Sequence, residues 1–238
     1  DNEEELKAIN EIAGGMGKKQ RVLLRVSPGI DPHTHKKIST GSTESKFGVA
    51  IETGQAKGFV KLAIELENVE LQGYHCHIGS QIFESEPFAT TLEIMLRFIV
   101  EMKKAFNFEP EILNIGGGFG VRYVEQEPVI DYDEKIKEVS YVLNEKCAEI
   151  GMEIPKIHME PGRSLVADAG MTLYTVTNVK EVKGYKNYVS IDGGMTDNPR
   201  YTLYESPYTV VLASRANDEK DFVATISGRC CESGDLIQ

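Results

Sequence analysis

Residues 111–120 read Glu-Ile-Leu-Asn-Ile-Gly-Gly-Gly-Phe-Gly, a short apolar run that leads directly into three consecutive glycines. The run predicts a buried strand, and the glycines predict a loop at its carboxyl end. Backbone without side chains can approach a phosphate closely there and donate amide hydrogen bonds to it. The spacing differs from the dinucleotide fingerprint GxGxxG because Gly120 comes one position too early, and a plain turn is the alternative interpretation.

Predicted helices and strands alternate on both sides of this stretch. Apolar residues recur at helical spacing in some segments, and shorter segments between them read as strands. The helical segments are residues 59–66, 92–99 and 136–147, and the strand segments are residues 21–26, 69–75, 111–115 and 156–160. Strands that alternate with helices in this way imply parallel βα units.

The pattern changes after Ala169, where short predicted strands follow one another and are separated by turns. Within residues 222–227 the apolar positions recur at every second residue, as in a sheet with one buried face. The predicted strands are residues 172–182, 188–192, 209–213 and 222–227. We therefore expect one domain in residues 1–168 and a second, all-β domain in residues 169–238.

Residues 30–48 form a polar stretch rich in His, Lys, Ser and Thr. The stretch is too long for a plain connector, which indicates a lid or a binding loop. A mobile, solvated loop is the alternative.

The 238-residue chain has the composition of a globular protein, with 41% hydrophobic and 26% charged residues, and this excludes a disordered tail. Its net charge of −11 argues against binding to nucleic acid or to an anionic membrane. No apolar stretch is long enough to span a membrane. The four cysteines include no CxxC pair, which favours a reducing compartment, and we expect a cytoplasmic protein.

Two further predicted strands end in residues that can carry chemistry, the segments 75–81 and 160–163. The carboxyl ends of the strands form the active site in α/β barrels, so these segments and the glycine loop predict one shared site. Glu160 can keep a heterocyclic nitrogen protonated while Arg163 binds an anion. A surface ion pair between these two residues is the alternative.

His75 and His77 share one face of an extended chain, a spacing that can serve a metal. No third ligand of a matching type is evident, and we expect no metal. We favour a single imidazole that lies against a flat cofactor ring, with Ser80 completing a phosphate-binding site.

Cys230 and Cys231 point to opposite faces of an extended chain, so at most one of them can address a given pocket. For Cys230 the simplest interpretation is a buried, inert thiol. Cys231 is followed by Glu232 and a turn, and it is a candidate reactive or proton-donating thiol. The neighbouring carboxylate would raise the pKa of this thiol.

Taken together, five segments resemble the diaminopimelate decarboxylase family, in the right order and over nearly the whole chain. They are residues 75–81, 116–120, 160–163, 192–200 with Tyr204, and 231–235. That family belongs to the pyridoxal-phosphate enzymes of the alanine racemase and ornithine decarboxylase type. The resemblance implies an α/β fold, with about the second half of a (β/α)8 TIM barrel in residues 1–168 and part of an all-β domain in residues 169–238.

The resemblance also implies roles for individual residues around pyridoxal 5'-phosphate and an amino-acid substrate. His77 would stack on the pyridine ring, and Glu160 would pair with the ring nitrogen. Cys231 would deliver a proton to the site of the other subunit, in a homodimer with shared active sites. Further cofactor contacts would be Ser80, Gly116, Gly117, Gly118, Gly162 and Arg163, and substrate contacts would be Arg163, Arg200, Tyr204 and Glu232.

Two elements of the family's pattern are missing from this sequence: the Schiff-base lysine segment, and the final β strands with a cofactor-contacting Tyr at the C-terminal end. Family members hold the cofactor through a lysine on the first barrel strand, in a Tyr/Phe-Ala-x-Lys context, and no such segment occurs here. The predicted strand at residues 21–26 would correspond to the fifth barrel strand. We therefore expect this chain to be the central part of a longer protein and to be inactive alone.

The expected reaction is the decarboxylation of meso-2,6-diaminopimelate to L-lysine, the last step of lysine biosynthesis. A carboxylate at Glu232 and a guanidinium at Arg200 complement the ammonium and the carboxylate at the far end of that substrate. Relatives of the ornithine decarboxylase type carry Asp after the cysteine. The alternatives are an ornithine, arginine or other basic amino-acid decarboxylase of the same fold, and a non-catalytic relative that only binds a partner.

Overall fold

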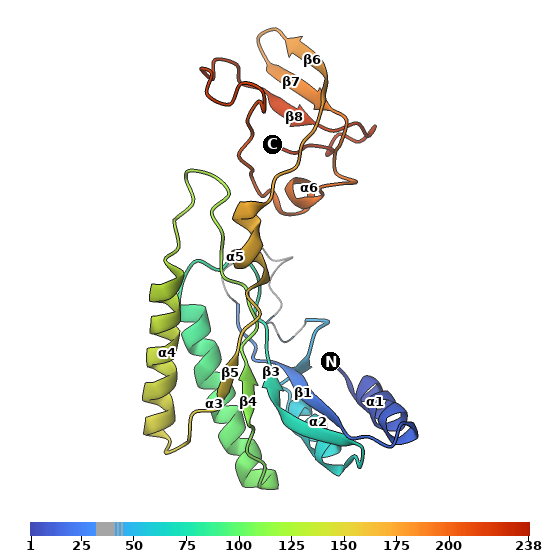
Figure 1. Cartoon of the computed structure of the whole chain (residues 1–238), viewed down its shortest axis with the longest axis vertical. Helices are drawn as coiled ribbons and strands as arrows, with labels where there is room; N and C mark the ends of the chain where they lie inside the picture. The colour runs from blue at the N-terminus through green and yellow to red at the C-terminus, as the bar shows by residue number, and fades with distance from the viewer. Residues whose placement is uncertain (32–40, 42, 44) are drawn as a thin grey trace. The chain divides into compact units, whose positions relative to one another are not determined.

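The computed structural model describes residues 1–31, 41, 43 and 45–238. The chain forms two compact units (Figure 1). Residues 1–121 and 130–168 make the first unit, and residues 122–129 and 169–238 make the second. Most of the polar stretch expected to be a lid or binding loop lies outside the described residues.

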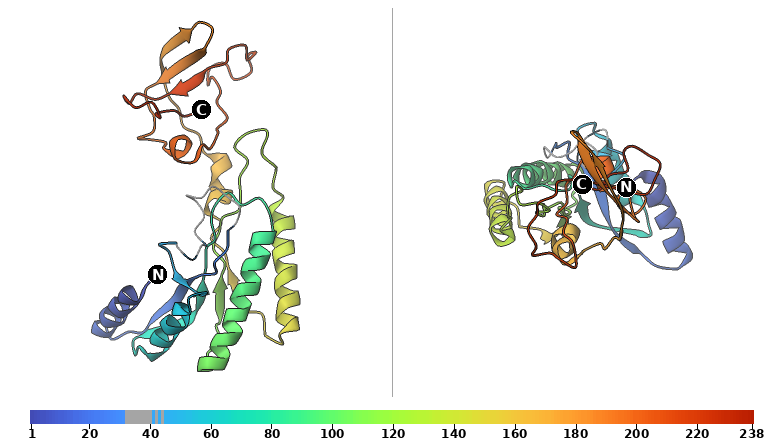
Figure 2. Two further views of the ribbon diagram at one scale, coloured as in Figure 1. Left: turned by 180° about the vertical axis from the view of Figure 1, so that it is seen from behind. Right: turned by 90° about the horizontal axis from the view of Figure 1, so that it is seen from above.

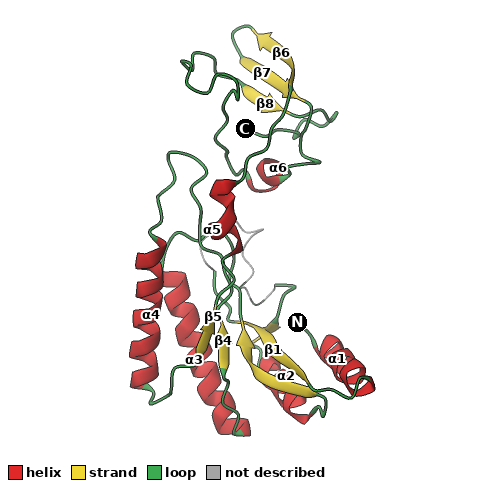
Figure 3. Ribbon diagram, viewed as in Figure 1, coloured by secondary structure: helices red, strands yellow, loops and turns green. Residues whose placement is uncertain are grey.

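The first unit contains a five-stranded sheet whose neighbouring strands all run parallel, in the order β2-β1-β3-β4-β5. The strands are β1 (Gln20–Ser27), β2 (Val49–Ala50), β3 (Val69–His75), β4 (Ile112–Asn114) and β5 (Lys156–His158). Figure 3 shows the helices that alternate with them. The helices are α1 (Glu3–Gly15), α2 (Gln55–Glu65), α3 (Glu86–Phe106), α4 (Tyr132–Glu149) and α5 (Gly162–Val166), followed by a 3-10 turn at Ala167–Ala169. The predicted parallel βα units are thereby confirmed.

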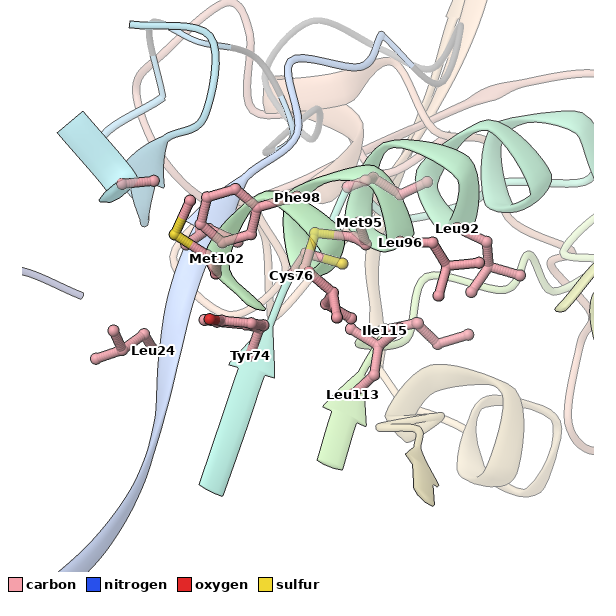
Figure 4. Close-up of a cluster of buried hydrophobic side chains, with 14 of the residues drawn as sticks. Leu24, Tyr74, Cys76, Leu92, Met95, Leu96, Phe98, Met102, Leu113 and Ile115 are labelled. Carbon is pink, nitrogen blue, oxygen red and sulfur yellow. The ribbon is translucent and has the colours of Figure 1, made fainter. Parts of the chain in front are cut away.

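The core of the first unit lies between the sheet and α3, and α2 covers the same face of the sheet (Figures 2 and 4). Helix α3 buries residues that are three or four positions apart, so one stripe of the helix meets the strands. The stripe includes Leu92, Met95, Leu96, Ile99 and Met102. From the strands, Leu24, Tyr74 and Leu113 pack against it. This core holds the carboxyl ends of β3, β4 and β5 at one edge of the sheet.

The second unit contains a three-stranded mixed sheet. Strand β6 (Val176–Val182) pairs antiparallel with β7 (Lys186–Ile191), and β8 (Thr225–Ser227) pairs parallel with β7. The short helix α6 (Arg200–Tyr204) interrupts the strands. The second unit is thus mainly β, with α6 as a short helical insertion between β7 and β8.

Two expectations for this part of the chain are wrong. Residues 209–213 form no strand, and only the last three residues of the segment 222–227 form one. Val210, Val211 and Leu212 are 44%, 51% and 52% exposed, so an apolar run here lacks the partner strand that would bury it. Residues 122–129 belong to the second unit, where the Thr209 hydroxyl donates to the carbonyl oxygen of Tyr123 at 2.7 Å.

None of the helices in the described part of the chain combines the length and the apolar character that crossing a membrane would require.

Candidate active site

The parallel register of β3, β4 and β5 brings three polar side chains together at one edge of the sheet. His75 lies beside Asn114 in the register of β3 and β4, and Glu160 follows the end of β5. Asn114 Nδ2 donates to Glu160 Oε1 at 2.8 Å, and His75 Nε2 lies 3.7 Å from Glu160 Oε2. The Glu160 side chain is 54% exposed, so its carboxylate is fixed on one side and open on the other.

Hydrogen bonds hold the glycine loop, residues 116–118, against this cluster. The Gly116 amide donates to Asn114 Oδ1 at 2.9 Å, and the Glu160 amide donates to the Gly116 carbonyl oxygen at 2.8 Å. A Cβ atom at Gly117 would overlap the Glu160 carbonyl oxygen, and one at Gly118 would overlap the carbonyl oxygen of Gly79. The loop is therefore packed tightly between the ends of the strands. A plain turn would not need such close packing.

The glycine loop gives a first mutational test. Gly117→Ala is expected to lower the free energy of unfolding by about 1–3 kcal/mol, because the added methyl overpacks the contact with the Glu160 carbonyl. Urea denaturation measures the change. Gly58→Ala in α2 is the matched control, because its Cβ would meet no atom within 4 Å and a helical alanine stabilises by roughly 0.5–1 kcal/mol. Equal urea midpoints for Gly117→Ala and the unsubstituted protein would contradict the close packing.

His77 is held as a neutral imidazole. Its Nδ1 accepts a hydrogen bond from the Gly117 amide at 3.3 Å, which leaves the proton of the neutral ring on Nε2. Burial, and then the charge of Arg25, lower the pKa of His77, while Glu160 opposes this shift. A neutral, half-buried ring of this kind suits stacking on a flat heterocycle.

His75 is also neutral at physiological pH. Burial lowers its pKa to about 4; Glu160 opposes the shift, whereas Arg25 and His77 add to it. Its buried Nε2 has no hydrogen-bond partner among the described residues. His75 Nε2 faces Glu160, whereas His77 Nδ1 faces the Gly117 amide. The two rings therefore do not point to one position where both could bind the same metal ion. Among the described residues, no three His, Cys, Asp or Glu side chains converge as metal ligands would.

The sequence predictions missed two residues of this cluster, Asn114 and Arg25. Asn114 is only 7% exposed and connects Glu160 to the glycine loop. Arg25 is the charge that acts on both histidines, and burial lowers its own pKa. Both residues interrupt apolar runs of predicted strands, and that signal in the sequence would have identified them.

Ser80 and Arg163, two of the residues predicted to contact the cofactor phosphate, are hydrogen-bonded to each other. Arg163, in α5, donates from Nε to Ser80 Oγ at 3.1 Å. The alternative of an ion pair between Arg163 and Glu160 is not favoured, because the Glu160 carboxylate contacts Asn114 and His75.

Three of the four predicted substrate residues, Arg200, Tyr204 and Glu232, and the predicted proton donor Cys231 belong to the second unit. Arg200 and Tyr204 lie four residues apart in α6, so they share a helix face. The Arg200 guanidinium lies over the ring of Tyr123 at 4.6 Å and over that of Tyr208 at 5.6 Å, and its Nε is buried without a hydrogen-bond partner. Cys231 and Glu232 are exposed.

Cys230 differs from the expectation of a buried thiol, because it is only partly buried. Burial raises the pKa of this thiol, and a hydrogen bond and the charge of Asp235 raise it further. All four cysteines are free thiols.

A parallel sheet that gathers a carboxylate, two neutral imidazoles and a glycine loop at its carboxyl edge defines an α/β-barrel type of enzyme domain. Two family models match this chain. The pyridoxal binding domain of pyridoxal-dependent decarboxylases matches residues 1–167, and the C-terminal sheet domain of the same proteins matches residues 98–238. The chain therefore belongs to the pyridoxal-dependent decarboxylases.

Similar curated proteins are diaminopimelate decarboxylases. That of Bacillus subtilis is 40% identical over the whole of this chain, which covers 54% of the relative. That of Halalkalibacterium halodurans is 43% identical, again over the whole of this chain and 54% of the relative. The chain thus spans about half the length of the curated relatives it matches.

Solved structures agree with this membership. The diaminopimelate decarboxylase of M. jannaschii, in complex with L-lysine, superposes with a TM-score of 0.85 at 36% identity, covering 98% of this chain and 52% of that one. The enzyme from Helicobacter pylori, also with L-lysine, gives 0.81 at 30% identity, covering 98% and 55%. The expected combination of a partial barrel and part of a β domain is confirmed.

The residues at the strand ends fit pyridoxal phosphate, the cofactor of this family. His77 offers a flat neutral ring, and Glu160 offers a carboxylate that is positioned on one side and open on the other. Two amides of the glycine loop, those of Gly116 and Gly117, already donate to Asn114 and His77. Phosphate contacts from this loop therefore remain a prediction, and Ser80 with Arg163 is the better supported part of that site.

Proposed function

We propose that this chain is the central part of a diaminopimelate decarboxylase, an enzyme that converts meso-2,6-diaminopimelate to L-lysine and carbon dioxide; the enzyme that contains the chain is called the complete protein below. The assignment of the substrate rests on Arg200. Its guanidinium lies over the ring of Tyr123 and near that of Tyr208, two rings that contact each other edge to face. None of the ion pairs in the described part of the chain involves it. An oriented cation of this kind is ready for a substrate carboxylate.

The strand-end residues would hold the cofactor. Glu160 would keep the ring nitrogen protonated, and Asn114 fixes the direction of that carboxylate. His77 would lie against the ring, and Ser80, the glycines 116–118, Gly162 and Arg163 would contact the phosphate. When bound, pyridoxal phosphate supplies the electron sink that lets an amino acid lose its carboxylate as carbon dioxide.

The residues of the second unit would handle the substrate. The bond from the α carbon to its carboxylate carbon breaks, carbon dioxide leaves, and a proton replaces it on the α carbon. Cys231 would deliver that proton. Arg200 and Tyr204 would hold the distal carboxylate, and Glu232 would hold the distal ammonium.

We further propose that the complete protein is a cytoplasmic homodimer with shared active sites, and that its partner molecule in the cell is a small amino-acid substrate. The free thiols support a reducing compartment. The exposure of Cys231 and Glu232 supports a role outside their own unit.

Substrate turnover tests the function. The complete protein is expected to release carbon dioxide and L-lysine from meso-diaminopimelate, because only a substrate with both distal charges engages Arg200 and Glu232. Ornithine and arginine are the control substrates, since they lack the distal carboxylate. Faster turnover of ornithine or arginine would assign the protein to the other basic amino-acid decarboxylases. No turnover of any of the three would favour a binding role.

The 238-residue chain alone is expected to be inactive on the same substrate, because it lacks a lysine in the Tyr/Phe-Ala-x-Lys context. Carbon dioxide release by the purified chain would contradict that expectation.

A further inference from the structure

Asp235 is a buried carboxylate for which the proposed reaction has no direct use. It lies four residues after Cys231 and is 2% exposed. Its Oδ1 accepts a hydrogen bond from the Met195 amide at 2.5 Å, and its Oδ2 accepts one from the Cys230 amide at 2.6 Å. Short bonds from amides to an ionised carboxylate are among the strong ones in proteins.

The two amides come from segments that are distant in the sequence. Met195 lies between β7 and α6, on the path to Arg200, whereas Cys230 directly precedes the predicted proton donor. One carboxylate therefore bridges the loop that leads to the distal substrate site and the loop that carries Cys231. Both loops belong to the second unit.

Further hydrogen bonds join the same two loops. We call these two loops, with the Asp235 carboxylate between them, the Asp235 junction. The Arg229 amide donates to the Gly193 carbonyl oxygen at 3.0 Å, and the Gly228 amide donates to the carbonyl oxygen of Asp235 at 2.8 Å. From α6, the Thr202 hydroxyl donates to the Gly234 carbonyl oxygen at 2.8 Å. The helix that carries Arg200 and the turn that carries Glu232 are thus parts of one hydrogen-bonded assembly.

Glycines allow the backbone to approach the carboxylate. A Cβ atom at Gly194 would lie 2.5 Å from Asp235 Oδ1, and one at Gly228 would overlap the same carboxylate. The carboxylate is therefore enclosed by backbone from both loops, and no room is left for a larger or displaced side chain at position 235.

We propose that Asp235 is a positioning residue that holds the loop of Cys231 and Glu232 in place. The proposal rests on the proposed function, because it assigns no chemistry to Asp235 itself. Without the Asp235 carboxylate, the two loops lose the hydrogen-bond acceptor that they share. The Cys231 thiol is then no longer held in one position. Protonation of the product carbon would then come partly from solvent.

The test uses Asp235→Asn in the complete protein. An Asn side chain has one acceptor oxygen, so its amino group faces an amide donor and one of the two bonds is lost. We expect kcat, normalised to bound cofactor, to fall about tenfold with a change of less than twofold in cofactor affinity. In D2O, deuterium on the product carbon should lose its single stereochemistry. A merely structural role would lower the folded fraction and leave the stereochemistry intact.

Asp218→Asn is the matched control, because Asp218 is an exposed carboxylate of the same unit. It should leave kcat and stereochemistry unchanged. Asp235→Glu is the second variant, since it keeps the charge but is one methylene too long for the enclosed site. Stereospecific deuteration at the normal kcat in a folded Asp235→Asn or Asp235→Glu protein overturns the proposal. Failure of both variants to fold assigns Asp235 to stability alone and overturns it as well.

A readout without turnover separates this proposal from the proposed function. Asp235 helps to raise the pKa of the Cys230 thiol, so Asp235→Asn should increase the rate of Cys230 alkylation by iodoacetamide severalfold at pH 7.5. Peptide mass spectrometry distinguishes Cys230 from Cys231. Faster alkylation in a protein that does not turn over diaminopimelate would support the Asp235 junction while the proposed function fails. Unchanged alkylation would count against the junction itself.

Discussion

Glu160→Gln in the complete protein is expected to lower kcat by roughly 10²–10⁴-fold while the cofactor stays bound. The substitution keeps the shape of the side chain, and a Gln oxygen can still accept the 2.8 Å bond from Asn114. It removes the negative charge that holds the ring nitrogen protonated, and an unprotonated pyridine is a poor acceptor of the electrons left by carbon dioxide. Single-turnover and steady-state rates of carbon dioxide release measure the loss.

The control for this prediction lies on the same sheet. Glu111 precedes β4 at the opposite end of the strands and is exposed, and its carboxylate pairs with Lys156 at 3.8 Å on the surface. Glu111→Gln is expected to leave kcat within about twofold, because exposed pairs of this kind contribute little. If Glu160→Gln turned over as fast as Glu111→Gln, Glu160 would be only the hydrogen-bond partner of Asn114.

The regular elements of the first unit follow from local patterns. Val69–His75 is predicted with the bounds that the structure shows, because apolar Val69 and Leu71 alternate with polar residues directly after a helical pattern. The stripe on α3 was likewise visible as helical spacing around residues 92–99. Burial of one helix face against a parallel sheet is encoded within each segment, so a single sequence can reveal it.

The elements of the second unit are less predictable because their strands depend on partners. Residues 209–213 have the composition of a strand, yet they stay exposed where no strand pairs with them. A local pattern does not say whether a partner exists. The assignment of residues 122–129 to the second unit also depends on contacts that are distant in the sequence.

The residues of the candidate site likewise divide into those that the sequence predicts and those that it does not. Glu160, His77 and Arg163 stand in short segments whose residue types already indicate their chemistry. Asn114 and Asp235 act by joining backbone amides of other loops, and this property exists only after folding. Asp235 lies in the segment 231–235 that resembles the family, but its two donors lie at positions that no periodicity connects with it.

Cys231 is expected to act on the site of the neighbouring subunit, and mixed dimers can show this. Cys231→Ala subunits lack the proton donor, and Glu160→Gln subunits lack the carboxylate that serves the ring nitrogen. If each active site combines Glu160 of one subunit with Cys231 of the other, a heterodimer of the two variants has one site with both defects and one intact site. If both residues come from the same subunit, each site of the heterodimer carries one defect.

The two arrangements predict different activities. Equal mixing of the two variants into two-fold dimers makes half of them heterodimers, so the shared arrangement restores about a quarter of the unsubstituted activity. The same-subunit arrangement leaves the activity at the level of the separate variants. Cys147→Ala is a matched cysteine control, because Cys147 is buried in the first unit and its subunits should supply a functional donor when they are mixed with Glu160→Gln subunits. Subunit exchange, followed by mass spectrometry of differently tagged chains, has to be complete. Complete exchange without recovery would show that Cys231 serves its own subunit or has no part in the proton transfer.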